Sequence, residues 1–211
     1  MPKFVDAALR RQEVVEAVFR IVAADGLERA SLREVADEAE LAVGSVRHYF
    51  ASSDELLSHS FGVVVDRIVS RLAAADDRLA EAQPGTPEYH QGVLTLLGEL
   101  LPLDDERAVD ACVWMAFKNA ARTKPFLAAE ADRSHRAVAA IVGRLVMDLS
   151  SANADVAVDQ QRLVTEAERL LATLDGLTMH ALLQPEWMTA QMCGDVLESH
   201  LTGLGSYAGS H

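Results

Sequence analysis

Apolar residues recur along this chain at intervals of three and four positions, the spacing that places side chains on one face of an α-helix. The first such stripe contains Val14, Val18 and Val22 and ends at Gly26, which favours the positive φ found just after a helix. No segment alternates apolar and polar positions for long enough to predict a strand. We therefore expect an all-α fold with about nine helices.

Two serines are each followed, three residues later, by a glutamate: Ser31 by Glu34, and Ser52 by Glu55. In such a capping box the serine hydroxyl accepts a first-turn amide, and the glutamate answers the amide of the serine. The second box opens a long helix that ends before the sequence Gln-Pro-Gly-Thr-Pro of residues 83–87.

Beyond this break the periodicity predicts further helices, over residues 87–101, 105–121, 125–149, 157–183 and 186–204. The segment 105–121 is apolar almost all round, so we expect it to be central. A polar linker is expected at 150–155 and a flexible tail at 205–211.

Residues 31–50 carry the most informative pattern. A short helix at 32–39 is followed by three residues and a second short helix at 43–50, which is the spacing of a helix-turn-helix. The crossing of the two helices requires a small residue, Ala36, and apolar residues in the angle between them: Val35, Leu41, Val46 and Phe50. An ordinary helical hairpin would show the same residue types and stays open as an alternative.

The formal charge of −13 weighs against nucleic acid as a partner. Residues 1–50 hold seven basic and nine acidic residues, and the rest of the chain is far more acidic. Any contact with DNA therefore has to come from a local patch.

No pattern for catalysis, metal binding or membrane insertion is present. The histidines have no metal-ligand spacing, and Cys112 and Cys193 lie in apolar helical patterns typical of buried thiols. No apolar run approaches the roughly 18 residues of a membrane span, and no signal peptide is visible. We expect a cytoplasmic protein that is not an enzyme, with no catalytic residues, cofactor, metal or membrane contact.

Residues 10–57 resemble the DNA-binding domain of the TetR family of bacterial regulators. The matching positions are Gly26, Ser31, Val35-Ala36, Gly44, His48-Tyr49-Phe50, Ser52 and Leu56-Leu57. Residues 174–183 and Trp187 are similar to the BetI-type branch of that family. The resemblance implies a DNA-binding domain at 1–52, a ligand-binding and dimerisation domain at 53–204, and a tail at 205–211.

Four positions depart from the family pattern. Glu40 replaces the usual turn glycine, so a positive φ there would cost about 1 kcal/mol. Ala42 replaces a capping Ser or Thr and leaves one amide uncapped. Arg47 replaces a tyrosine, and Ser53 replaces a lysine that would contact phosphate.

The implied function is that of a ligand-responsive transcriptional repressor. It would bind a pseudo-palindromic double-stranded DNA operator as a homodimer and leave it when a small-molecule effector binds. Base contacts are expected from Val43, Ser45 and His48, close approach at Gly44, and phosphate contacts from Ser31, Arg33, Arg47 and Tyr49. Arg10 and Arg11 could reach the adjacent backbone or the minor groove.

The expected ligand-binding residues are mostly apolar and aromatic: Phe61, Leu97, Trp114, Met115, Phe117, Asn119, Phe126 and Leu177. Asn119 is included because a buried amide requires a partner. The expected dimer interface comprises Leu163, Ala167, Leu170, Leu174, Ala181, Cys193, Leu197, Leu201 and Leu204.

Three further alternatives remain at this point. The two apolar stripes of the dimer interface could instead cover the core of their own chain. The protein could be a helical partner-binding scaffold that has lost DNA binding, as its acidity and the missing lysine suggest. An all-α enzyme is a further alternative, which no catalytic motif favours.

Overall fold

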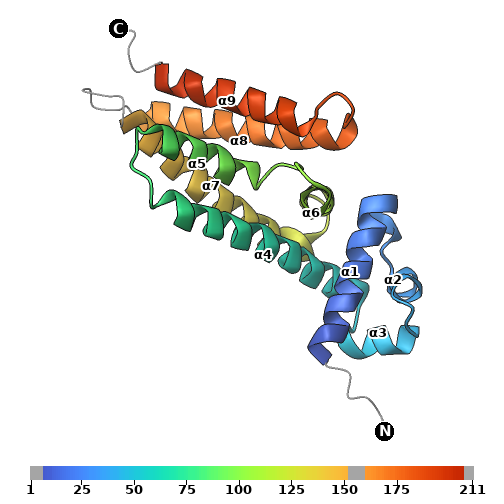
Figure 1. Cartoon of the computed structure of the whole chain (residues 1–211). Helices are drawn as coiled ribbons and strands as arrows, with labels where there is room; N and C mark the ends of the chain where they lie inside the picture. The colour runs from blue at the N-terminus through green and yellow to red at the C-terminus, as the bar shows by residue number, and fades with distance from the viewer. Residues whose placement is uncertain (1–6, 152–159, 207–211) are drawn as a thin grey trace. The chain divides into compact units, whose positions relative to one another are not determined.

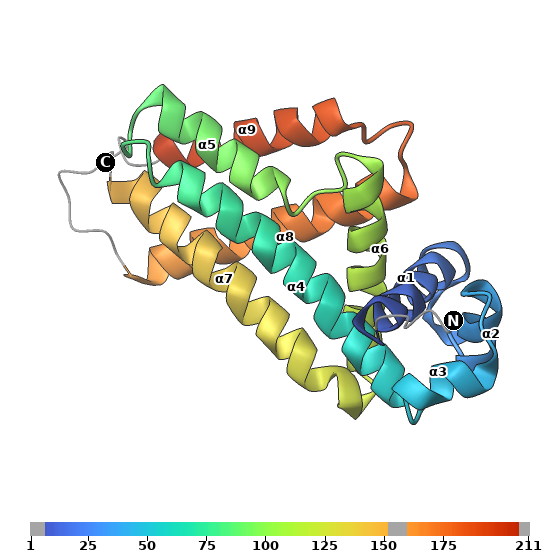
Figure 2. The same ribbon diagram turned by 60° about the horizontal axis from the view of Figure 1, so that its bottom comes forward.

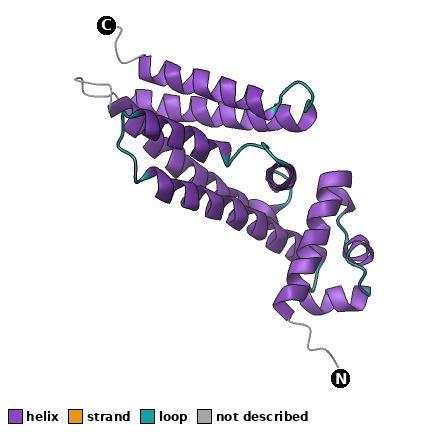
Figure 3. Cartoon of the chain, viewed as in Figure 1, coloured by secondary structure: helices purple, strands orange, loops and turns teal. Residues whose placement is uncertain are grey.

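The computed structural model describes residues 7–151 and 160–206, and within them it contains helices, turns and loops but no strand (Figure 3). Nine α-helices and two short 3-10 helices lie in these ranges. The predicted all-α fold is confirmed. None of the described helices has the length and apolar character needed to cross a membrane.

The elements follow one another in the order α1 (Ala7–Asp25), η1 (Leu27–Arg29), α2 (Leu32–Glu38), α3 (Val43–Tyr49), α4 (Ser53–Leu79), α5 (Pro87–Gly98), α6 (Asp105–Ala121), η2 (Pro125–Leu127), α7 (Ala128–Ser151), α8 (Gln160–Leu183) and α9 (Ala190–Ser206).

Some helix boundaries differ from those predicted. The segment expected to begin a helix at 125 starts with η2, and α7 runs into the expected linker as far as Ser151. Helix α9 begins at Ala190 rather than 186, because the amides of Trp187 and Met188 bond back to the carbonyl of Gln184. The rest of the linker, the first residues of the helix expected at 157–183, and residues 207–211 lie outside the described residues.

The chain divides into two compact units. The first comprises residues 1–67 and 112–133, and so contains α1 to α3, the first half of α4, the second half of α6, η2 and the start of α7. In this unit α1 contacts α2, and α2 contacts α3 (Figure 1). The core includes Val18, Val35, Val46, Phe50 and Phe61, all with no exposed surface.

The second unit comprises residues 68–111 and 134–211. In it α8 and α9 lie side by side, and α5 contacts α9 (Figures 1 and 2). Its core holds one charged group that the sequence analysis did not anticipate. Asp110 is 1% exposed, and its carboxylate accepts a hydrogen bond from Arg71 Nη1 at 2.5 Å. The Arg71 guanidinium offsets the cost of burying this charge.

Helix α6 is less uniformly buried than its composition predicted. Val113 and Phe117 are fully buried, but Trp114 and Met115 are half-buried and Val109 is exposed. The expectation that this helix is central is therefore met only along one face.

Each predicted capping box forms in part. Ser31 Oγ accepts the Glu34 amide at 3.2 Å, and Ser52 Oγ accepts the Glu55 amide at 3.1 Å. The glutamates do not return to the serines as predicted. Glu34 instead lies 3.6 Å from the Arg29 guanidinium, and Glu55 accepts the amide of Ala51 at 2.8 Å.

Both predicted positions of positive φ occur where expected. Gly26, just after α1, has φ 85°, and Glu40, in the turn between α2 and α3, has φ 54°. A glutamate in the left-handed region pays a steric cost that glycine does not.

Replacing this glutamate should therefore stabilise the fold. Glu40→Gly is expected to raise the free energy of unfolding by roughly 0.5 to 1 kcal/mol in a urea titration. Asp37→Gly is the matched control, since Asp37 is exposed within helix α2, and it should lower the same quantity by about 0.3 kcal/mol. An equal loss in both variants would show that the turn carries no strain.

Candidate nucleic-acid interface

The pairing of α2 with α3 rests on complete burial at their contact. Ala36 of α2 and Val46 of α3 have no exposed surface, and Phe50, directly after α3, has none either. The amide of Leu41 donates to the carbonyl of Ala36 at 2.8 Å, which closes the turn. Leu41 itself is only half-buried, while the other predicted packing positions are buried as expected.

With Val46 fixed inward, the opposite face of α3 is exposed. Gly44, Ser45, Arg47 and His48 are exposed along it. Val43 and Tyr49, at the two ends, are half-buried. No side chain caps the start of α3, as the alanine at position 42 predicted.

The cationic residues predicted to contact DNA fall into two groups. Arg33 and Arg47 are exposed and form no ion pair with any described residue. Arg10, by contrast, donates to Glu13 at 2.6 Å, and the Arg11 guanidinium lies 4.9 Å from the centre of the Phe50 ring. Arg33 of α2 and Arg47 of α3 are thus available to contact DNA, whereas Arg10 and Arg11 of α1 already contact other residues of the chain.

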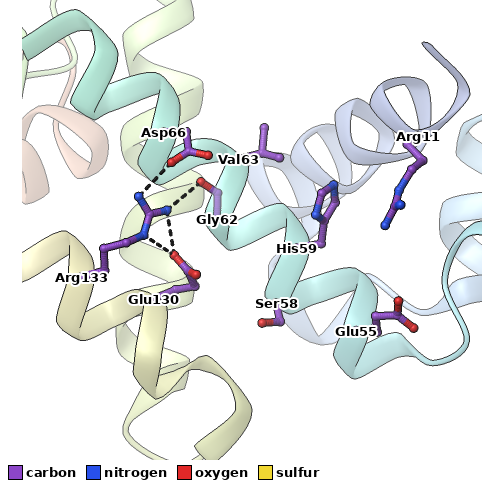
Figure 4. A pocket seen from close by; sticks show the side chains of 9 residues that line it. All are labelled: Arg11, Glu55, Ser58, His59, Gly62, Val63, Asp66, Glu130 and Arg133. Carbon is purple, nitrogen blue, oxygen red and sulfur yellow. Dashed lines mark hydrogen bonds and ion pairs between the residues drawn. The ribbon is translucent and has the colours of Figure 1, made fainter. Parts of the chain in front are cut away.

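Sequence reasoning missed a polar pocket beside this helix pair. It has a volume of about 550 Å³ and is lined by residues of α1, α4 and α7 (Figure 4). His59 of α4 lies on it, with its ring 5.4 Å from that of Phe50. Burial and the positive charge of Arg11 lower the pKa of His59, while Glu55 and Asp66 oppose that change. The residues that line the pocket come from α1, α4 and α7, which lie far apart in the sequence, so no local pattern signals it.

The predicted ligand-binding residues are divided between the two units. In the first unit the rings of Phe61 and Phe117 stack at 5.1 Å, and the Lys118 ammonium lies 4.2 Å from the centre of the Trp114 ring. Met115 and Phe126 are half-buried there. Leu97 and Leu177 are buried in the second unit.

Asn119 differs from its prediction. It is exposed rather than buried, and it lines a pocket of about 350 Å³ together with Leu27 and Lys124. The premise of a buried amide was wrong, because Asn119 lies two residues, or about 200° of helix turn, beyond the buried Phe117.

Most of the residues predicted for the dimer interface are buried by their own chain. Leu163 and Ala167 are half-buried, and the side chain of Leu204 lies outside the described residues. The other six are at most 9% exposed, and so offer little surface to a second copy: Leu170, Leu174, Ala181, Cys193, Leu197 and Leu201. The alternative that these stripes cover the core is the one that the burial favours.

Two short helices joined by a tight turn, with the second presenting an exposed face, have the arrangement of a helix-turn-helix. The family described as "Bacterial regulatory proteins, tetR family" matches residues 14–59, and "BetI-type transcriptional repressor, C-terminal" matches residues 90–206. The chain therefore belongs to the TetR family of transcriptional regulators and has a BetI-type C-terminal, ligand-binding domain. This is a family of transcriptional regulators, not of enzymes.

Relatives extend over nearly the whole chain. The HTH-type transcriptional regulator PksA of Bacillus subtilis is 32% identical over 209 residues, which cover 97% of this chain and 94% of PksA. A crystal structure of a transcriptional regulator from Rhodococcus sp. Rha1 matches with a TM-score of 0.76 and 28% identity, over 95% of this chain and 98% of that one. A regulator from Saccharomonospora viridis, solved in complex with choline, has a TM-score of 0.73 and 18% identity over 95% and 97% of the two chains, a likeness of fold alone.

Gly44 provides a test of this surface. A Cβ added at Gly44 would meet no atom within 4 Å, so Gly44→Ala should preserve or slightly raise the free energy of unfolding. If the backbone of α3 approaches DNA closely, the added methyl group should nevertheless weaken DNA binding, measured by fluorescence anisotropy. Gly143→Ala, equally uncrowded within α7, is the control and should leave binding unchanged. Unaltered DNA affinity in Gly44→Ala would contradict close approach at this residue.

Proposed function

We propose that this regulator is a repressor that binds a pseudo-palindromic operator as a homodimer and is released by a small molecule. The observation that carries the proposal is the exposed face of α3, on which Ser45, Arg47 and His48 are exposed while Val46 holds the helix to its unit. A helix held in this way can enter a major groove with side chains directed at base edges.

The contacts divide by chemistry. Val43, Ser45 and His48 would meet base edges, and Gly44 would allow the backbone close to DNA. Arg33, Arg47, Tyr49 and Ser31 would contact phosphates, although the Ser31 hydroxyl also caps α2. Arg10 and Arg11 would have to leave Glu13 and Phe50 before reaching DNA.

The surface that we propose for dimerisation is the exposed apolar part of α8 and the residues that follow it. Met179 and Leu183 are 46% and 67% exposed and lie four residues apart, and Val164 is 51% exposed. Their spacing places the three within about 100° of arc on α8. Trp187 is 75% exposed in the turn before α9. Exposed apolar side chains that share one face of a helix can form a surface that a partner covers.

The effector pocket that we propose involves the aromatic residues of α4 and α6 in the first unit. Phe61 and Phe117 stack on each other and are fully buried, and Trp114 is half-buried. An effector would therefore reach these aromatic rings, which are of the kind that lines small-molecule sites, by opening their packing. An effector there would lower DNA affinity only if it binds the DNA-free conformation more tightly than the DNA-bound one.

DNA binding should depend strongly on salt and on few cations. With labelled DNA from the region flanking the gene, anisotropy should show saturable binding that weakens as salt rises. Arg47→Ala should weaken binding and reduce the slope of log affinity against log salt by about 1. Arg78→Ala is the control, because Arg78 is also exposed but lies in the second unit, and it should bind like the parent protein.

Two outcomes would contradict this proposal. If the slope of log affinity against log salt is the same for Arg47→Ala and the parent protein, Arg47 does not contact a DNA phosphate. Absence of saturable binding would favour the partner-binding scaffold instead.

The dimer proposal has its own test. Trp187→Glu places a charge where an apolar side chain is exposed, so it should shift the protein from dimer to monomer in analytical ultracentrifugation. Met147→Glu, which replaces a methionine 48% exposed on α7, should leave the mass unchanged. A parent protein that sediments as a monomer, or equal masses for the parent and Trp187→Glu, would rule this surface out.

A further inference from the structure

The pocket beside the helix-turn-helix follows α4 from Glu55 to Asp66, a length of about 16 Å. Its two ends differ in how completely their polar groups are satisfied (Figure 4). None of the residues proposed for base contact lines it.

One end is closed by an ion-pair cluster. The Arg133 guanidinium of α7 donates to Asp66 Oδ1 at 2.8 Å and to Glu130 Oε2 at 2.8 Å, and also to the carbonyl of Gly62 at 3.2 Å. Two carboxylates and one carbonyl thus occupy this guanidinium. This end has little capacity left for a ligand.

At the other end, Arg11 Nε is buried and forms no hydrogen bond with any described residue. The His59 ring beside it is exposed and also forms no hydrogen bond with any described residue. Glu55 is nearby, but its Oε2 already accepts the Ala51 amide. Ser58 Oγ donates to the carbonyl of Phe126 at 3.4 Å. A buried guanidinium N–H without an acceptor is unfavourable, and an oxyanion would satisfy it.

We propose that the Arg11 and His59 end of this pocket binds the acidic group of a small organic anion, a carboxylate or a phosphate ester. Arg11 supplies the charge and a planar set of donors, and the His59 ring supplies a further N–H. The volume of about 550 Å³ lies within the usual range for small-molecule sites and leaves room for the rest of such a ligand.

This site would couple to α3, the helix that we propose enters the major groove, through Phe50. Phe50 directly follows α3, and the Arg11 guanidinium and the His59 ring both contact its ring. An anion that draws the guanidinium away from that ring changes a contact at the end of the helix.

The site should also respond to pH. His59 is faced by Arg11 from α1, by Glu55 and Asp66 from α4, and the ion-paired Glu130 and Arg133 of α7 line the same pocket. A bound anion counters the positive charge of Arg11, so it raises the pKa of His59 above that of the free protein. By linkage, the anion binds more tightly below the free-protein pKa, and affinity falls as pH rises through the pKa of the complex.

The test uses the full chain without DNA, so its outcome is independent of the proposed repressor function. The His59 ring resonances are followed by NMR during titrations with inorganic phosphate and, separately, acetate at constant ionic strength. We expect a saturable change that is strongest below the pKa of His59 in the free protein, which burial and Arg11 hold below the ordinary histidine value, and that weakens as pH rises. Arg11→Gln should weaken binding about tenfold or more, while Arg78→Gln should match the parent protein.

A second variant allows the test to be made even if the first does not fold. If Arg11→Gln fails to fold, Arg11→Lys keeps the charge but loses the planar fork, and should bind with intermediate affinity. Resonances that do not move with either anion, or that move equally in the Arg11 variant and the parent, would overturn the proposal. A change produced by operator DNA but by neither free anion would assign these donors to the DNA backbone and would also overturn it.

Discussion

The orientation of α3, the proposed DNA-contacting helix, depends on one close contact, which is its packing against α2 at Ala36. Ala36 and Val46 are fully buried, so a larger side chain at position 36 would force the helices apart. The turn that makes this approach possible places Glu40 at φ 54° and lets the Leu41 amide bond back to Ala36. The exposed face of α3 is therefore a consequence of burial on its other side, together with backbone strain in the turn.

Phe50 extends this constraint to the rest of the first unit. It lies at the end of α3, is fully buried, and its ring meets Arg11 of α1 and His59 of α4. Three helices thus meet at one aromatic side chain. Since aromatic rings attract cations through their faces, the position of α3 is linked to the charge state of the groups around it. This is the physical route by which chemistry in the adjacent pocket could reach the DNA-binding surface.

The sequence predicted what local rules govern and missed what distant contacts decide. The positive φ of Glu40 follows from a turn position at which glycine is usual, and the missing cap of α3 follows from an alanine. The return bonds of the capping glutamates failed because competing partners, such as Arg29 for Glu34, are close in space. Likewise, the three- and four-residue spacing of apolar residues places Leu170 on one face of a helix, but only the structure shows that this face is buried by the same chain. The contact of Arg11 with Phe50 joins distant residues and has no local signal.

The acidity of the whole chain need not oppose DNA binding at the helix pair, because several acidic residues of the first unit are ion-paired. In the first unit Arg20 pairs with Glu38, Arg67 with Glu16, and Lys124 with Glu28. These pairs neutralise their members locally, and screening confines the field of the remaining charges to about 10 Å. What a DNA phosphate meets at the helix pair is therefore set by the charges that lack such partners among the described residues, which include the cations Arg33 and Arg47 and the carboxylates Asp37 and Glu40. Net charge describes the whole surface, whereas recognition depends on where unpaired charge is placed.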